Sequence, residues 1–297
     1  MKLNWIQRQN PTARSVALGT FDGVHLGHQR LLQEAIARKT LGGTSCVCTF
    51  DIPPEQYFQG RLRLLSSFQT RVELFLAFGI DEVAWLPFGT EFTSMEAQDF
   101  VTKFLVNELR ANEVICGYNY RFGSKRGGDA AFLQEQGKLY GFSVTVVPPV
   151  TAKDGQTISS TAIRKLLAQG RLAAAARYLG YYPSYRGEIT RADRGDRSPL
   201  TARFDPALVL PGEGVYLTRC LGPKQEGAFA LAAVRGACDI ELFMLDSRGQ
   251  GFGHLLDVQF VHRLGDVGSA PPGESERMAA RQLLPGFHLQ DGKVVLK

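Results

Sequence analysis

The stretch Gly19-Thr-Phe-Asp-Gly-Val-His-Leu-Gly-His28 follows the apolar run Ser15-Val-Ala-Leu18 and precedes a helical pattern. In that pattern, apolar residues recur at helical spacing at Leu31, Leu32, Ala35 and Ile36. The stretch therefore predicts a glycine-rich turn between a strand and a helix. Glycines let the backbone approach a ligand closely, and the N–H groups that begin a helix favour an anion. His25 and His28 lie at that helix mouth, where both can point toward the same anion.

A zinc pair and two surface histidines are the competing interpretations of His25 and His28. The other histidines of the chain are His254, His262 and His288, and they form no second paired set. Zinc is therefore disfavoured, because its protein sites ordinarily need three or four ligands.

Strand-like and helical patterns alternate outward from this turn. Strands are expected over residues 15–18, 44–50, 82–86, 113–116 and 143–147. Helices are expected after a Ser67 cap, after a capping box at Thr93-Ser-Met-Glu96, and over residues 129–140, 161–169 and 172–179. This alternation predicts an α/β domain with right-handed crossovers and a mostly parallel sheet.

The pattern changes after residues 181–185, where a proline and several aromatic residues interrupt the helices. Short strand-like runs follow at residues 187–191, 214–219, 228–235, 239–246 and 255–263, and one closing helix is expected over 275–284. These runs predict a small antiparallel β-barrel or sandwich. We therefore expect one domain over residues 1–184 and a second over residues 185–297.

Composition excludes several classes of protein. The chain has 297 residues, of which 44% are hydrophobic and 21% are charged, and its net charge is +5. The whole surplus of positive charge lies within residues 1–184, which fits a phosphate-rich small ligand. The chain has no run of Lys and Arg residues of the kind that binds nucleic acid. It also has no apolar stretch long enough for a membrane span. Without a visible secretory signal, five scattered cysteines indicate reduced thiols in a cytoplasmic protein. The oligomeric state is not predicted.

Two further segments have residues suited to phosphate. The first is Gly117-Tyr-Asn-Tyr-Arg-Phe-Gly-Ser-Lys-Arg-Gly-Gly-Asp129, which follows the fourth expected strand and combines glycines, aromatics and three cations. Because ligands of open parallel sheets bind beyond the carboxyl ends of the strands, this segment is expected to line the same crevice. The second is Ile158-Ser-Ser-Thr-Ala-Ile-Arg164, where three hydroxyl residues and a cation begin a helix. A solvated basic loop and a plain capped helix are the respective alternatives.

The three motifs, in this order, resemble the adenylyltransferase module of the bacterial bifunctional riboflavin kinase/FAD synthetase family, over residues from about 15 to 190. The resemblance implies a Rossmann-like nucleotidyltransferase domain with a parallel sheet, followed by a small antiparallel β-barrel. It implies the reaction of ATP with FMN to give FAD and pyrophosphate, with Mg²⁺. One departure is Thr49-Phe-Asp-Ile-Pro-Pro54, where the family usually reads Thr-Phe-Glu-Pro-His-Pro.

The resemblance also implies the roles of individual residues. The catalytic residues would be His25, His28 and Arg164. Those expected to bind ATP are Gly19, Phe21, Asp22, Gly23, Gly27, Ser159, Ser160 and Thr161. Those expected to bind FMN are Asn119, Arg121, Lys125 and Arg126, and no metal ligand is assigned.

The second half of the chain is less similar to that family. The family's kinase module has the motif Gly-x-Pro-Thr-Ala-Asn, and the best match here is Ser198-Pro-Leu-Thr-Ala-Arg203. Thr201 is retained, but Arg203 replaces the asparagine, and an arginine cannot accept a metal ion. Glu241 lies where the family has its catalytic base, and the second phosphate motif is missing.

We therefore expect FMN adenylylation by an enzyme whose kinase-like barrel is degenerate. A misaligned but working kinase, and thus a bifunctional enzyme, is one alternative. A flavin- or nucleotide-binding regulator without catalysis is another, and a nucleotidyltransferase acting on a different phosphate is a third.

Overall fold

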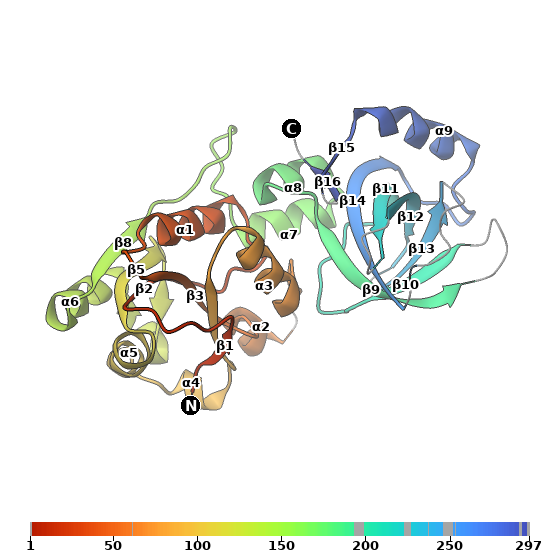
Figure 1. Ribbon diagram of the computed structural model, residues 1–297. Helices are drawn as coiled ribbons and strands as arrows, with labels where there is room; N and C mark the ends of the chain where they lie inside the picture. The colour runs from red at the N-terminus through yellow and green to blue at the C-terminus, as the bar shows by residue number, and fades with distance from the viewer. Residues whose placement is uncertain are drawn as a thin grey trace. The chain divides into compact units, whose positions relative to one another are not determined.

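The computed structural model describes residues 2–60, 62–192, 199–222, 227–236, 238–245, 252, 254–290 and 293–295 (Figure 1). The first part of the chain forms one six-stranded sheet in the order β1-β4-β3-β2-β5-β8. Its strands are β1 (Asn4–Ile6), β2 (Arg14–Leu18), β3 (Thr44–Phe50), β4 (Glu82–Leu86), β5 (Ala111–Gly117) and β8 (Ser143–Val147). All neighbours pair in parallel except β1, which runs antiparallel to β4 at the edge. The predicted α/β fold with a mostly parallel sheet is confirmed.

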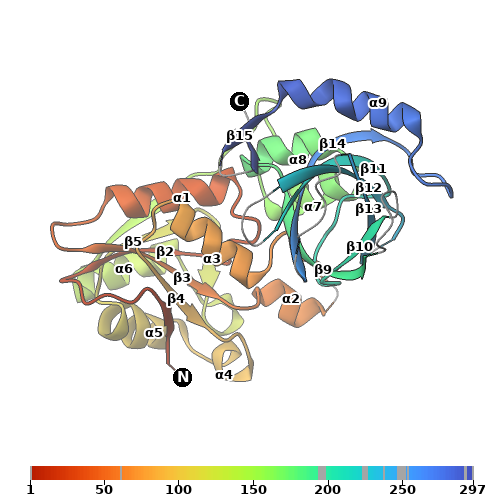
Figure 2. The same ribbon diagram turned by 45° about the vertical axis from the view of Figure 1, so that its right-hand side comes forward.

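Helices cover both faces of this sheet (Figure 2). One face packs against α1 (Leu26–Ala37) and α3 (Phe68–Ala77), and the other against α5 (Ala97–Phe100), η1 (Val101–Glu108) and α6 (Ala130–Tyr140). The alternation of strand side chains explains the two cores, since Val16 and Leu18 lie in one cluster and Ala17 in the other. Every residue of β2 is buried, as expected for a central strand of a parallel sheet.

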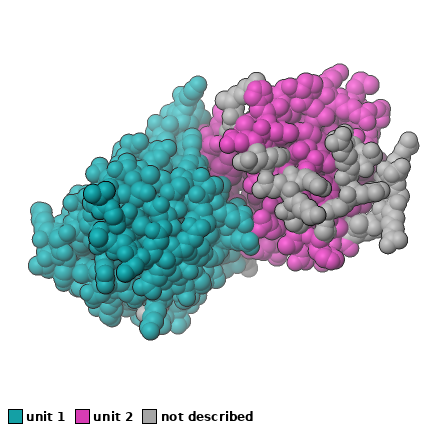
Figure 3. All heavy atoms as spheres, viewed as in Figure 1, with its two compact units in different colours: residues 1–62, 66–159 teal, residues 63–65, 160–297 magenta. Residues whose placement is uncertain are grey.

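The described chain falls into two units (Figure 3). The first comprises residues 1–62 and 66–159, and the second comprises residues 63–65 and 160–297. The helices α7 (Ser160–Ala168) and α8 (Leu172–Leu179) thus pack with the second unit. A functional domain boundary after Ser184 stays a prediction, because packing groups elements without assigning their activity.

The second unit contains a closed six-stranded barrel in the order β10-β13-β12-β11-β14-β9, with all pairings antiparallel. The strands are β9 (Ser184–Ala192), β10 (Leu200–Phe204), β11 (Gly214–Leu221), β12 (Gly227–Val234), β13 (Asp239–Met244) and β14 (Leu255–Gly265). Helix α9 (Glu274–Leu283), η3 (Leu284–Gly286) and the hairpin of β15 (His288–Gln290) with β16 (Lys293–Val295) follow. The barrel confirms the predicted antiparallel architecture and adds β10, a strand that the sequence pattern did not predict.

The predicted capping box at Thr93-Ser-Met-Glu96 is wrong. Thr93 ends the short helix α4 (Thr90–Thr93), where its hydroxyl donates to the carbonyl of Thr90 at 2.9 Å. Glu96 is the N-cap of α5, without a side-chain cap bond. Because Thr and Ser hydroxyls can bond back to the preceding helical turn, the pattern did not show which turn the hydroxyl would serve. The Ser67 cap is confirmed, since its hydroxyl accepts from the N–H of Thr70 at 3.1 Å.

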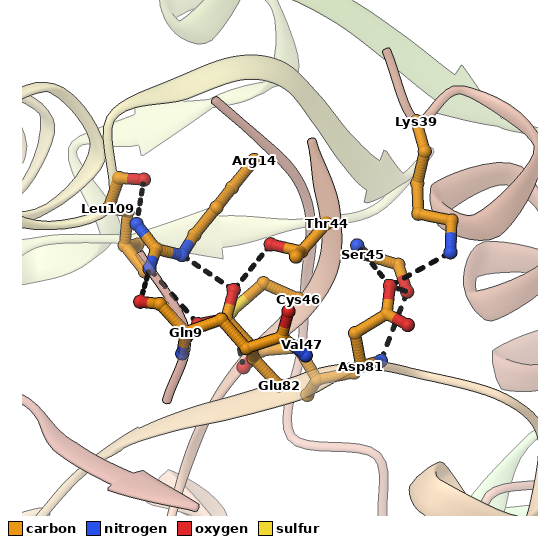
Figure 4. Close-up of polar contacts among 10 residues, drawn as sticks. All are labelled: Gln9, Arg14, Lys39, Thr44, Ser45, Cys46, Val47, Asp81, Glu82 and Leu109. Atoms are coloured by element: carbon orange, nitrogen blue, oxygen red, sulfur yellow. Dashed lines mark hydrogen bonds and ion pairs between the residues drawn. The ribbon is translucent and has the colours of Figure 1, made fainter. Parts of the chain in front are cut away.

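A buried polar network joins the amino ends of three parallel strands (Figure 4). Arg14 begins β2 and Glu82 begins β4, and their side chains form a two-bond ion pair: Nε–Oε2 is 2.8 Å and Nη2–Oε1 is 3.0 Å. Thr44, the first residue of β3, donates to the same carboxylate, and Arg14 also donates to the carbonyl of Leu109. The network stabilises the amino ends of these strands. The predicted ligand crevice lies at their opposite, carboxyl ends.

The described part of the chain contains no helix with both the length and the apolar character that crossing a bilayer requires.

Candidate active site

Two of the predicted phosphate loops begin side by side. The parallel strands run in the order β4-β3-β2-β5-β8, so the direction of strand addition reverses between β2 and β5. Ligands of open α/β sheets bind at this switch point, beyond the carboxyl ends of the strands. The loop of residues 19–28 follows β2 and the loop of residues 117–129 follows β5. Because Ala17 is in register with Ile115, the two loops leave neighbouring strands at the same edge.

The first loop brings the two histidines together. His25 is the N-cap of α1, and its Nδ1 accepts a hydrogen bond from the backbone N–H of His28 at 3.3 Å. The two imidazoles are stacked, with ring centroids 3.7 Å apart and an interplanar angle of 16°. An accepting Nδ1 leaves the proton of a neutral His25 on Nε2. Their contact with phosphate stays a prediction.

The surroundings of His28 favour its neutral form. Burial, then the neighbouring His25, then Arg71 lower the pKa of His28 well below its ordinary value of 6.5. Its Nδ1 has no hydrogen-bond partner among the described residues. The ring can therefore offer an N–H to a ligand at neutral pH, but it does not supply a charge there.

Two glycines of this loop make room for its own side chains. A Cβ on Gly27 would lie 3.0 Å from Cε1 and 3.1 Å from Nδ1 of His25. A Cβ on Gly19 would lie 3.1 Å from the ring of Phe21, whose φ of 54° is left-handed. Gly23 also has a positive φ, 77°, which glycine adopts without strain. These glycines are therefore required for the shape of the loop as well as for any approach of ligand.

Phe21 and Asp22, both predicted to bind ATP, have buried side chains. Phe21 packs in the core, and its ring meets that of His28 edge-on with centroids 5.3 Å apart. Asp22 accepts from the backbone N–H of Ser66, and Gly23 donates its N–H to the Ser66 hydroxyl at 2.9 Å. The contact of Phe21 and Asp22 with ATP stays a prediction.

The second loop carries the residues predicted to bind FMN. Arg121 begins β6 (Arg121–Phe122), which pairs with β7 (Gly128–Asp129), and its guanidinium lies 3.3 Å from the Asp129 carboxylate. The short turn η2 (Ser124–Arg126) lies between them, with left-handed φ values of 54° at Lys125 and 61° at Arg126. Such strain in residues other than glycine is frequent at ligand-binding sites.

The side chains of Lys125 and Arg126 are exposed, as is Asn119. The loop rests on the start of α5, since a Cβ on Gly123 would lie 2.7 Å from the backbone N of Ala97. The structure thus places Asn119, Arg121, Lys125 and Arg126 in one loop, and their role toward FMN stays a prediction.

The third motif is divided between the two units. Ser159 belongs to the first unit, whereas Ser160, Thr161 and Arg164 belong to α7 in the second. Arg164 donates from Nε to the carbonyl of Arg63 at 2.8 Å, within that unit. An approach of α7 to the histidines stays a prediction.

The kinase-like residues lie on neighbouring barrel strands. Thr201 of β10 is in register with Glu241 of β13, and Arg203 is in register with Asp239. Arg203 makes two bonds to the Asp239 carboxylate, with Nε–Oδ1 at 2.8 Å and Nη2–Oδ2 at 3.3 Å. Ser198 lies outside the described residues.

Glu241 is also engaged by an arginine. Arg235 forms a close ion pair with the Glu241 carboxylate. The same guanidinium donates to the carbonyls of Gly268 at 3.0 Å and Ala270 at 2.8 Å. Two carboxylates of this part of the barrel are therefore paired with arginines.

Sequence reasoning missed Arg71 of α3, which is fully buried beneath the first loop. The available signal was a single arginine beside the apolar positions Val72 and Phe75 of an amphipathic helix. In the described part of the chain, no group of three or more His, Cys, Asp and Glu side chains is arranged to hold a metal ion.

Comparison with known proteins extends these observations. The bifunctional riboflavin kinase/FMN adenylyltransferase of Listeria monocytogenes is 29% identical over 263 residues, covering 82% of each chain. That of Escherichia coli is 33% identical over 218 residues, covering 70% of this chain and 68% of the relative. A crystal structure described as a macrolide-efflux protein from Streptococcus pneumoniae matches with a TM-score of 0.76 and 26% identity, over 94% of this chain and 93% of that one.

A sequence model described as FAD synthetase matches residues 7–162. That range exceeds half of the chain and contains both loops at the switch point, together with the start of α7. The chain therefore belongs to the FAD synthetase family.

Proposed function

We propose that this chain is an FMN adenylyltransferase that transfers AMP from ATP to FMN, giving FAD and pyrophosphate. The observation that carries the proposal is the stacked pair His25 and His28 at the first turn of α1, beside the switch point of the sheet. Membership of the FAD synthetase family supports it.

The reaction needs alignment and charge neutralisation more than acid–base chemistry. The FMN phosphate is an anion at neutral pH, so no general base is required. One of its oxygens attacks the α-phosphorus of ATP, and the bond from that phosphorus to the bridging oxygen breaks, so its electrons leave with pyrophosphate. Donors aimed at oxygens whose charge grows in the transition state accelerate such a transfer.

The residues of the three predicted motifs are suited to this work. His25, His28 and the first N–H groups of α1 would donate to the phosphates of ATP. Arg164 would add positive charge, with Ser159, Ser160 and Thr161 as further donors. The loop with Asn119, Arg121, Lys125 and Arg126 would hold FMN. Mg²⁺ would enter with ATP, whose phosphate oxygens are the ligands that this ion prefers.

We further propose that riboflavin kinase activity is lost. Phosphorylating riboflavin would need a base for its hydroxyl and a correctly held ATP–Mg²⁺. Arg203 offers no lone pair to a metal ion, and its guanidinium is already bonded to Asp239. The Glu241 carboxylate is paired with Arg235, so the expected base is engaged as well.

The test is to incubate the purified chain with ATP, Mg²⁺ and either FMN or riboflavin, and then to separate the flavins. FAD and pyrophosphate are expected from FMN, and neither FMN nor FAD above a no-enzyme control is expected from riboflavin. Failure to form FAD from FMN would overturn adenylylation, and binding of FMN and ATP without turnover would favour the regulator. Formation of FMN or FAD from riboflavin would favour the bifunctional enzyme instead. AMP transfer to another phosphate, but not to FMN, would indicate a different nucleotidyltransferase.

A further inference from the structure

Arg71 places a buried cation beneath the loop of the two histidines. Its side chain has no exposed surface. Nη1 donates to the carbonyls of Thr20 at 2.7 Å and Phe50 at 3.0 Å, and Nη2 donates to that of Asp51 at 2.6 Å. Thr20 follows β2, Phe50 ends β3 and Asp51 follows β3. One side chain therefore joins the carboxyl ends of two neighbouring strands.

The cation has neutral carbonyls as its hydrogen-bond partners. Burial lowers the pKa of Arg71 to about 10, while the nearby carboxylates of Asp22 and Asp51 oppose the shift. The side chain is therefore still charged at neutral pH. Removing a charge from water is costly, so a buried arginine needs a compensating reason to be there.

Arg71 also acts on His28 through space. Its positive charge opposes protonation of that imidazole, together with burial and with His25. In the described part of the chain, the titratable groups that shift the pKa of His28 are His25 at the N-cap of α1 and Arg71 from α3, and the apolar ring of Phe21 meets the imidazole edge-on. Among the described residues, Nε of Arg71 and Nδ1 of His28 are both buried without a hydrogen-bond partner.

We propose that Arg71 is a positioning residue for adenylyl transfer: it fixes the loops after β2 and β3 and supplies a permanent positive charge under the histidines. A fixed charge attracts the phosphates while His28 remains an uncharged donor. Because the charge is built into the fold, it needs no reorganisation when substrate binds. This inference rests on the proposed function for its catalytic part, and on the fold alone for its effect on His28.

Three variants separate charge from packing. Arg71→Lys keeps a cation but cannot keep all three carbonyl bonds in the same geometry. Arg71→Gln removes the charge and keeps a donor. Arg30→Gln is the matched control, since it removes an exposed cation from α1 two positions after His28, where solvent screens its charge.

The first readout is the titration of His28 by NMR of isotope-labelled histidine, with the signal assigned from His28→Gln. In Arg71→Gln the pKa of His28 is expected to rise by about one unit, because a like charge has been removed. Arg71→Lys and Arg30→Gln are expected to leave it close to that of the wild type. An unchanged titration in folded Arg71→Gln would overturn the electrostatic role.

The second readout is FAD formation from FMN and ATP across pH. Arg71→Gln is expected to lower kcat by about 10²-fold with a smaller change in KM for FMN, and to move the acid limb of kcat/KM to higher pH. Arg71→Lys is expected to recover most of kcat. Thermal unfolding identifies any variant that fails to fold, in which case Arg71→Lys alone decides, by its kcat, whether the three carbonyl bonds matter.

The outcomes distinguish this inference from the proposed function. If the wild type forms no FAD, adenylylation fails, while the His28 titration still tests Arg71. If the wild type forms FAD and folded Arg71→Gln matches it in kcat and in pH profile, adenylylation stands and the role of Arg71 is overturned.

Discussion

The imidazoles of His25 and His28 stack at 3.7 Å because both belong to one helical turn, in which His25 accepts the N–H of His28. The stack places two ring donors at the mouth of α1, where the helix dipole favours an anion.

His28→Ala is expected to lower kcat for FAD formation by about 10²–10³-fold, because it removes a donor whose contact strengthens in the transition state. KM for FMN is expected to change much less. His262→Ala, in an exposed position of β14, is the control and is expected to be active. Equally small losses in kcat and in FMN affinity would mark His28 as structural.

Gly27→Ala is expected to reduce activity. The melting temperature is measured as well: alanine is favoured over glycine by about 1 kcal/mol in a helix interior, but Gly27 lies in the first turn of α1, where crowding of His25 opposes that gain. The added Cβ would lie 3.0 Å from the ring of His25 and would displace it. We expect kcat to fall by about tenfold or more. Gly265→Ala, whose Cβ would meet open space, is the comparison, and equal activity of the two variants would contradict the argument.

Stability of the first unit is expected to fall below pH 6.5 through His28. Its folded pKa is depressed, so the unfolded chain takes up a proton that the folded chain excludes. The stability that the first unit has above pH 6.5 is therefore lost as the pH falls below that value. The free energy of unfolding decreases by as much as about 1.4 kcal/mol per pH unit. Urea unfolding at pH 7 and pH 5, followed by tryptophan fluorescence, measures it, because Trp5 and Trp85 both lie in the first unit. His28→Gln is expected to lose less stability between the two pH values, and an equal loss would refute the assignment.

Glu82→Gln is expected to destabilise the first unit by about 3–5 kcal/mol, because it leaves Arg14 buried without its counter-charge. The exposed pair of Lys103 with Asp99 gives the control, and Lys103→Gln is expected to cost less than about 1 kcal/mol. Urea unfolding compares the two. The folded fraction of Glu82→Gln is expected to retain its kcat, since the network lies at the amino ends of the strands.

Arg203→Asn is not expected to create riboflavin kinase activity. The substitution frees Asp239 and restores an acceptor, but Arg235 still holds the Glu241 carboxylate. The measurement is the sum of FMN and FAD formed from riboflavin and ATP in the variant and in the wild type. Riboflavin kinase activity in Arg203→Asn, but not in the wild type, would show that Arg203 by itself prevents the reaction.

Much of the fold followed from local pattern. The predicted bounds of β3, β4 and β8 match those observed, because each is a short run of strand-forming residues between clear turn signals; β3 and β4 are buried, whereas β8 is a partly exposed edge strand. The edge strand β1 has three residues and gave no such run, so only its pairing with β4 defines it. The grouping of α7 and α8 with the barrel likewise depends on packing between segments distant in sequence.

The candidate site also has residues that the sequence predicts and residues that only the tertiary structure reveals. His25 and His28 could be predicted from sequence, because their contact arises within one helical turn. Arg71 could not, because its carbonyl partners lie 20 to 51 residues away and meet it only after β2, β3 and α3 have packed. The sequence likewise shows a cation at position 203, but only the register of β10 with β13 shows that Asp239 lies opposite it. Sequence alone thus determined the elements and the residues that are close along the chain. Tertiary structure decided which charges are buried and which are paired, since burial and pairing depend on atoms that the chain brings together only when it folds.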